Sequence, residues 1–221
     1  MSRLERERLL ERVRTDGDES SAHALLDAFF SGFPVERLRE VLNSESEDAV
    51  RAGAWLASEL GSKVAPLIAD LALLLDHPSR YVRFFALDGV LMGATERDGA
   101  TIAKAVELVD DRESAIRWKA TNLLGRASTQ QLSASVPYLR GDVRALAERL
   151  VLLETEPGDQ CVRDLLQGDS EGERRLGLIA SLRRSKRDPS LLSVAAKSEY
   201  PDVHEIAREW LGSVLGEKPN P

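Results

Sequence analysis

The feature that most constrains this 221-residue chain is a helical stripe that occurs twice, one repeat apart. In residues 79–91 an aliphatic residue precedes an arginine, an alanine follows four places after that aliphatic residue, and a second aliphatic residue follows four places later. Residues 114–125 keep the same order. Residues four apart lie on one face of a helix, so each segment predicts a helix with one buried stripe. The stripes consist of Val82, Arg83, Ala86 and Val90, and of Ile116, Arg117, Ala120 and Leu124. A stripe that occurs twice predicts a repeat protein.

A two-helix unit recurs from Pro34 onward, and turn residues such as Asp76, His77 and Pro78 separate most of its helices. First helices are expected over residues 35–42, 64–75, 100–109, 129–139, 160–166 and 190–196. Second helices are expected to begin near residues 48, 79, 114, 142, 171 and 202. The chain therefore holds about six helical hairpins, of which the one around residues 173–182 fits the pattern least well.

Residues 1–33 lack the repeat. Two segments with apolar residues, 2–14 and 21–30, flank a polar break at residues 16–20. Terminal units of a repeat array need a polar outer face. We therefore predict an N-terminal helical cap over residues 1–33, a repeat array over 34–216 and a disordered tail over 217–221.

The composition favours helix, because 43% of the residues are hydrophobic but only 5% are aromatic. A net charge of −7 repels phosphate backbones and acidic membranes, which disfavours nucleic acid as a partner. The sequence shows neither a signal peptide nor an apolar run of about 20 residues. Its one cysteine, Cys161, excludes an internal disulfide. We expect a soluble, cytoplasmic protein that does not bind membranes.

The turns and second helices resemble the HEAT-repeat family, in which an Asp in the turn precedes Val-Arg-x-x-Ala-x-x-x-Leu-Gly. Residues 116–125 match this motif throughout, with Asp110 or Asp111 before them, and residues 82–90 match nearly as well. Residues 203–212 match except that His204 replaces the arginine. The resemblance covers roughly residues 34–214. It implies an all-α, right-handed α-solenoid of about six HEAT-like hairpins, and it says little about activity because the family spans adaptors, transport factors, inhibitors and a few enzymes.

The repeated arginine lies at the edge of the buried stripe. We predict that these arginines stack along the array and meet turn carboxylates such as Asp76 or Asp110. The alternative, a phosphate-binding stripe, is disfavoured by the acidic charge of the chain. The arginines are Arg51, Arg83, Arg117 and Arg144.

The face turned away from the stripe is the expected binding surface, because those positions line the concave side of a stacked array. Two neighbouring units place a large ring there with a polar residue one turn later. Exposed rings and arginines are common anchors of interfaces. The predicted contact residues are Phe84, Asp88, Trp118, Asn122, Arg149, Glu205 and Glu209. The alternative is that the rings pack between repeats, as we expect for Phe85 and Tyr81. Trp55 and Trp210 are also expected to be packing residues rather than contact residues.

Catalytic, metal and cofactor sites are not predicted. The three histidines lie in different units and show no zinc-binding spacing, and no glycine-rich phosphate loop is present. HEAT-like alkylpurine DNA glycosylases hold a tryptophan cluster with an aspartate, to which Phe84, Asp88, Trp118 and Asn122 are faintly similar. Those enzymes need a basic surface, whereas this chain is acidic. A HEAT-like di-iron hydroxylase needs several His-Glu pairs, and only His204-Glu205 is present.

The sequence thus favours a non-enzymatic module that binds another protein, of basic or neutral charge. Its more specific form is a bacterial immunity-type protein that inhibits a cognate toxin through the concave face. A general scaffold or adaptor is equally compatible with these residues. The oligomeric state and the identity of the partner are not encoded in these patterns.

Overall fold

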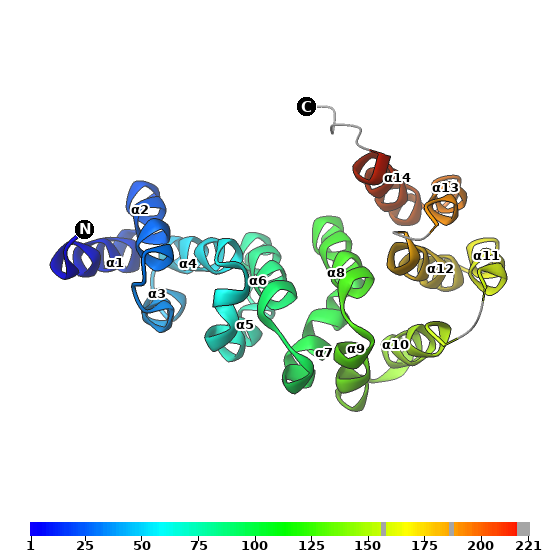
Figure 1. The fold of residues 1–221 in the computed structure, drawn as a ribbon, viewed down its shortest axis with the longest axis horizontal. Helices are drawn as coiled ribbons and strands as arrows, with labels where there is room; N and C mark the ends of the chain where they lie inside the picture. Colours follow the sequence, from blue (N-terminus) through cyan, green and yellow to red (C-terminus); the bar gives the residue numbers. More distant parts are fainter. Residues whose placement is uncertain (156–157, 186–187, 216–221) are drawn as a thin grey trace. The chain divides into compact units, whose positions relative to one another are not determined.

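The computed structural model describes residues 1–155, 158–185 and 188–215, and every regular element within these ranges is helical (Figure 1). The chain divides into two compact units, Met1–Ala105 (unit 1) and the residues from Val106 onward (unit 2). The predicted all-α class is confirmed. The predicted tail over 217–221 lies outside the described residues.

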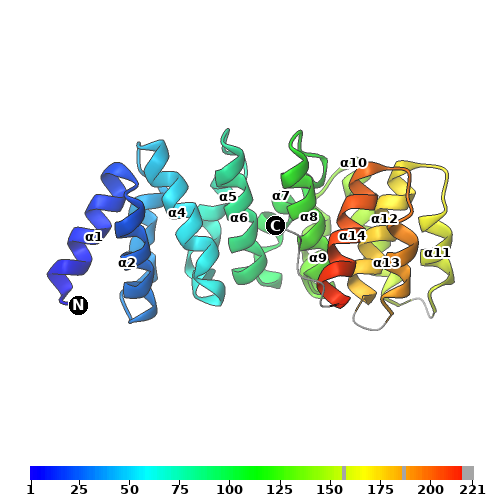
Figure 2. The ribbon, with the colours of Figure 1, turned by 90° about the horizontal axis from the view of Figure 1, so that it is seen from above.

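Unit 1 contains three helix pairs and the start of a fourth. Helices α2, α4 and α6 pack side by side (Figure 2), and α3 and α5 cover one side of α4 and α6 (Figure 1). The elements are α1 (Arg3–Asp16), α2 (Glu19–Phe30), η1 (Val35–Leu38), α3 (Arg39–Leu42), α4 (Glu47–Glu59), η2 (Gly61–Leu67), α5 (Ile68–Leu74), α6 (Arg80–Gly93), η3 (Glu96–Asp98) and α7 (Gly99–Glu107), which crosses the boundary between the units.

Unit 2 continues the same alternation of a short first helix and a longer second helix. Its elements are η4 (Leu108–Asp110), α8 (Ser114–Arg126), α9 (Thr129–Ser135), η5 (Val136–Tyr138), α10 (Gly141–Leu153), α11 (Gln160–Leu166), α12 (Glu171–Arg184), α13 (Ser190–Ala195) and α14 (Pro201–Leu215). Within each unit the first helix packs on the second helix that follows it, and η4 takes the place of the first helix before α8. The expected series of helical hairpins is therefore confirmed.

Local sequence explains where many helices begin. Ser2, Ser128 and Ser170 each accept a hydrogen bond from the backbone N–H three residues later, and the side chain at that later position bonds back to the serine N–H. These capping boxes satisfy donors that no helical carbonyl can reach. The positions of these helix starts are therefore encoded locally in the sequence.

The repeated stripe forms the core, as predicted. Val82, Ala86, Ile116, Ala120 and Leu124 are fully buried. A small residue is needed four places after the first stripe position because the helices approach closely there. In α12 the corresponding residue is Gly177, where an added Cβ atom would lie 2.8 Å from the backbone nitrogen of Leu166.

Helix α12 packs directly against α8 in unit 2, although α10 lies between them in the sequence (Figure 1). A Cβ atom added at Gly125 would lie 2.9 Å from Cβ of Leu182, which shows how near the two helices come. The Arg183 guanidinium donates hydrogen bonds to the carbonyls of Leu124 and Ala127 at the end of α8, at 2.8 and 2.6 Å. Helix α10 packs on α9 and α12 and makes no comparable contact with α8.

The arginine of the repeat binds the turn that precedes its helix. Arg83 donates to the carbonyl of His77 at 2.8 Å, Arg117 to that of Asp111 at 3.0 Å, and Arg174 to that of Gly168 at 2.7 Å. In all three cases the acceptor lies six residues earlier. In these three hairpins the arginine thus links the second helix to the turn before it. The bond made by Arg174 shows that residues 173–182 follow the same pattern as the other two hairpins.

The predicted arginine ladder needs a correction. Arg51 pairs with Asp48 and Arg144 with Glu148, each on its own helix, because both guanidinium groups are about half exposed and reach a carboxylate one turn away. Arg117 does meet a carboxylate from another hairpin, but that carboxylate is Asp202. Arg51 and Arg144 therefore do not take part in the predicted stack of arginines over turn carboxylates.

Candidate functional site

The predicted contact residues fall in both units. Phe84 and Asp88 lie on α6 in unit 1, and both are half-buried, with the Phe84 ring edge-on to Phe85 at 5.9 Å between centroids. Glu205 and Glu209 are exposed on α14 in unit 2. Whether any of these residues contacts a partner stays a prediction.

Trp118 and Asn122 lie on α8, and the structure brings them together. Asn122 is only 5% exposed and donates a hydrogen bond to the Trp118 carbonyl at 3.3 Å. An exposed position for Asn122 is therefore wrong, because η4, α12 and α14 enclose α8 on several sides. Trp118 is half-buried, and its indole Nε1 is buried without a hydrogen-bond acceptor among the described residues.

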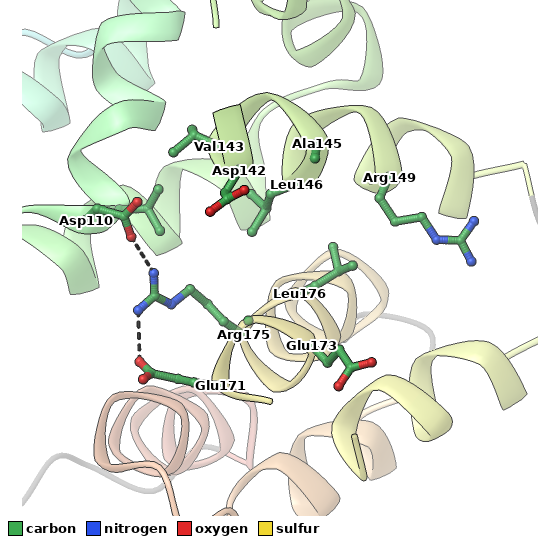
Figure 3. Close-up of a pocket in the computed structure, with 12 residues that line it drawn as sticks. Asp110, Asp142, Val143, Ala145, Leu146, Arg149, Glu171, Glu173, Arg175 and Leu176 are labelled. Atoms are coloured by element: carbon green, nitrogen blue, oxygen red, sulfur yellow. Dashed lines mark hydrogen bonds and ion pairs between the residues drawn. The ribbon is translucent and has the colours of Figure 1, made fainter. Parts of the chain in front are cut away.

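Arg149, the remaining predicted residue, lines an open groove in unit 2. The groove has a volume of about 500 Å³ and lies between η4, the inner face of α10 and the first turns of α12 (Figure 3). We call it the unit 2 groove. Its lining consists of Val109, Asp110, Asp142, Val143, Ala145, Leu146, Arg149, Glu171, Gly172, Glu173, Arg175 and Leu176.

One end of the unit 2 groove is acidic. The Arg175 guanidinium bridges the carboxylates of Asp110, at 2.6 Å, and Glu171, at 2.9 Å. Asp142 lies at the same end, and no described residue forms a hydrogen bond or ion pair with its carboxylate (Figure 3). Four carboxylates against two guanidinium groups leave the whole lining with a net charge of −2.

The middle of the groove is apolar. Figure 3 shows Leu146 from α10 and Leu176 from α12 pointing toward each other across the opening, with Val143 beside them. These side chains face an opening because α12 packs on α8 and leaves α10 to one side. In a closely stacked array, these apolar side chains would fill the interface between one second helix and the next. The groove is thus an incompletely filled hydrophobic seam with a negatively charged end.

An ion pair beside the groove holds α14 to α8. Arg117 donates to both carboxylate oxygens of Asp202, at 2.6 and 3.1 Å, and both side chains are about one-quarter exposed. The hydrogen bond from Arg117 lowers the pKa of Asp202 below its ordinary value, since it stabilises the carboxylate. Arg175 adds to this effect through its charge, so the pair and the acidic end of the groove share one electrostatic environment.

A second hollow lies in unit 1, where α2, α4 and α6 meet. It has a volume of about 340 Å³, and we call it the unit 1 pocket. Its lining consists of Gly17, Glu19, Ala22, His23, Asp48, Arg51, Ala52, Trp55 and Phe85. Trp55 was expected to pack between repeats; it is half-buried and forms a wall of this pocket.

The sequence could indicate only part of these sites. Ala145 and Arg149 occupy the helix positions predicted to face away from the stripe, and both line the unit 2 groove. Asp142, Leu146 and Leu176 were missed. One signal could have found the α12 side of the groove. If Arg174 is taken as the repeat arginine, like Arg117 and Arg144, then Arg175 and Leu176 occupy the same repeat positions as Ala145 and Leu146.

Other kinds of site have little support. Among the described residues no three His, Cys, Asp or Glu side chains come together in a way that could hold a metal ion. None of the described helices is long and apolar enough to cross a membrane.

Similar proteins are found among the solved structures. No protein-family model matches the chain, and no curated protein matches it. An archaeal HEAT-like repeat protein from Thermococcus onnurineus NA1 is similar over 96% of this chain and 97% of its own, with 13% identity and a TM-score of 0.51. A designed armadillo repeat protein, solved in complex with the peptide (KR)4, is similar over 98% of this chain and 99% of its own, with 14% identity and a TM-score of 0.50. The helical hairpins, the buried stripe and these similarities together show that this chain has the HEAT-like helical-repeat fold.

Proposed function

We propose that this chain is a non-enzymatic module that binds another protein, and that the unit 2 groove receives a segment of that protein. The segment carries a basic side chain for the acidic end and apolar side chains for the middle. The observation that carries the proposal is the Asp142 carboxylate, which pairs with none of the residues that the structure describes, beside the apolar side chains of Val143, Leu146 and Leu176. A segment of this kind supplies a counter-charge for the carboxylates and apolar contacts for the leucine and valine side chains of the groove.

The two parts of the groove act differently on a partner. Burial of apolar surface supplies affinity, at about 25 cal/mol for each Å² removed from water. The carboxylates supply selectivity, because a cation about 4 Å from Asp142 is attracted by about 1–4 kcal/mol at surface dielectric constants, whereas an anion is repelled by a similar amount. A basic and apolar segment is therefore preferred over an acidic or purely polar one.

The designed armadillo repeat protein offers a parallel. It has a similar fold and was solved with a peptide of alternating lysine and arginine. The similarity extends to the fold alone at 14% identity. It supports the proposal by showing that a helical-repeat scaffold of this kind accommodates a basic peptide.

A more specific form of the proposal is inhibition of a toxin, as in bacterial immunity proteins. A nuclease toxin has a basic active face, and the chain's net charge of −7 complements such a face. An adaptor uses the same groove for several partners. The two forms differ in stoichiometry and in number of partners: an inhibitor forms one tight complex that abolishes the activity of its partner.

The proposal is tested by titrating the full-length chain with a peptide that alternates arginine and leucine, using isothermal titration calorimetry. Replacing arginine by glutamate, or leucine by serine, should each weaken binding by about tenfold or more. Asp142→Asn and Leu146→Ser should weaken binding of the original peptide. Asp164→Asn, an equal charge change at an exposed position on α11 outside the groove, is the matched control.

The two outcomes are distinct. Loss of binding with Asp142→Asn and Leu146→Ser, but not with Asp164→Asn, supports the groove. Equal weakening by Asp142→Asn and Asp164→Asn would mean that only the total charge matters, and the groove would not be the binding site. The predicted contacts of Phe84, Asp88, Trp118, Glu205 and Glu209 are tested by alanine substitution in the same titration.

A further inference from the structure

The unit 1 pocket has aromatic walls. Trp55 from α4 and His23 from α2 meet edge to face, with 4.6 Å between ring centroids and 62° between ring planes, so they form a corner rather than a flat stack. Phe85 from α6 also lines the pocket. Three rings from three different helices therefore surround one hollow.

Small residues create the space between these rings. Gly17, Ala22 and Ala52 also line the pocket. Gly17 has a φ of 66°, and an added Cβ atom there would lie 2.5 Å from the backbone carbon of Asp48. Glycine is thus required at this position both for its backbone conformation and for the close approach of the α1–α2 turn to the start of α4. The close approach at Gly17 thus fixes how the α1–α2 turn lies against the start of α4 beside the pocket.

Carboxylates lie at the mouth of the pocket. Asp48 pairs with Arg51 at 2.8 Å, so these two side chains balance each other. Glu19 is exposed, and no described residue forms a hydrogen bond or ion pair with its carboxylate. With His23 neutral, the lining carries a net charge of −1. One added cation would neutralise the pocket.

We propose that the unit 1 pocket is a binding site for an alkylammonium group. The faces of Trp and Phe rings carry negative electrostatic potential and attract a cation within about 6 Å of the ring centroid, whereas the methyl or methylene groups of an alkylammonium ion pack against the same rings. The Glu19 carboxylate adds the counter-charge. The net negative charge of the lining disfavours an anion, and a neutral apolar group leaves the Glu19 charge without a counter-ion.

This site is separate from the proposed function, because the unit 2 groove contributes none of its residues. An alkylammonium group can come from a free organic cation or from a lysine side chain, methylated or not, on another protein. Both sources present the same chemistry to the rings.

The test uses the full-length chain and three small probes, followed by the chemical shifts of the tryptophan indole N–H groups in NMR titrations. The probes are choline, its uncharged isostere 3,3-dimethylbutan-1-ol, and a peptide that contains trimethyllysine. Choline or the peptide should shift the Trp55 signal in a saturable way, and the isostere should bind at least about tenfold more weakly. Saturation by choline alone identifies a free cation as the source, and tighter binding of the peptide identifies a protein.

Variants complete the test. Trp55→Ala should abolish binding, which is measured by isothermal titration calorimetry because this variant lacks the reporting indole. Trp210→Ala, at a half-buried tryptophan outside the pocket, should leave binding unchanged. Trp55→Ala removes a half-buried ring and can therefore also destabilise the fold. Glu19→Gln is a second variant that removes a charge but keeps the size of an exposed side chain, and it should weaken binding about threefold to tenfold. Asp142→Asn should not alter it, which separates this site from the unit 2 groove. Equal binding of choline and the isostere, or no saturable shift with either cation in folded protein, would overturn the proposal.

Discussion

Removing the Arg117 guanidinium should destabilise unit 2 strongly. Arg117 makes a two-pronged ion pair with Asp202, at 2.6 and 3.1 Å, and donates to the carbonyls of Asp111 and Arg112 at 3.0 and 3.2 Å. Arg117→Met keeps most of the aliphatic volume and deletes all four hydrogen bonds. Each such bond contributes about 0.75 kcal/mol in net terms at this partly exposed site, so the loss of all four is expected to lower the free energy of unfolding by about 3 kcal/mol. For a protein of this size the melting temperature falls by about 6–12 °C.

The repeat itself supplies a matched control. Arg51 occupies the same position in an earlier repeat, but it is 55% exposed and forms an ion pair with Asp48, one turn away on the same helix. An exposed pair of this kind contributes little, so Arg51→Met should change the melting temperature by no more than about 2 °C. Thermal unfolding of both variants, followed by circular dichroism at 222 nm, makes the comparison. Equal effects of the two substitutions would refute the reasoning that Arg117 holds α14 to α8.

Three further predictions concern pH, packing and salt. The pKa of Asp202 is lowered in the folded chain, so the stability that its ion pair contributes is fully present above the unfolded pKa and is lost as the pH falls through the folded pKa. The difference in melting temperature between wild type and Arg117→Met should therefore be full at pH 7 and shrink below about pH 4. Gly177→Ala should lower the free energy of unfolding by about 1–3 kcal/mol, because the new Cβ atom would lie 2.8 Å from the Leu166 nitrogen. Gly172→Ala, with no atom within 4 Å of the new Cβ, should be neutral or stabilising by up to about 1 kcal/mol, and chemical denaturation measures both variants. Raising the salt concentration from about 0.05 to 0.5 M should weaken binding of the arginine–leucine peptide, because screening acts on the exposed carboxylates of the groove, and unchanged affinity would argue against an electrostatic contribution.

Local periodicity predicted the fold because the fold is made of local units. The stripe through Val82 and Ile116 encodes which face of each helix is buried, and the turns encode where the helices end. The hairpin at residues 173–182 looked irregular for a specific reason. Glu173 takes the first stripe position as the partner of Ser170 in a capping box, and Gly177 takes the place of alanine. Arg174 preserves the arginine of the motif.

The candidate sites could be predicted only in part, because they depend on contacts between hairpins. Arg149 follows from helix geometry alone, and it lines the unit 2 groove. The groove exists because α12 packs on α8 and leaves α10 to one side, and no periodic signal reports that arrangement. The same packing encloses Asn122, which periodicity had placed on the surface. Nonlocal packing thus decides both where the groove opens and which predicted residues remain accessible.

Hydrogen exchange of the full-length chain, with and without the arginine–leucine peptide, tests the central claim most directly. If the unit 2 groove receives the peptide, backbone amides of α10 and of the first turns of α12 should exchange more slowly in the complex, because their opening is then coupled to dissociation. Slower exchange only outside α10, α12 and η4, or no change at saturating peptide, would contradict the account.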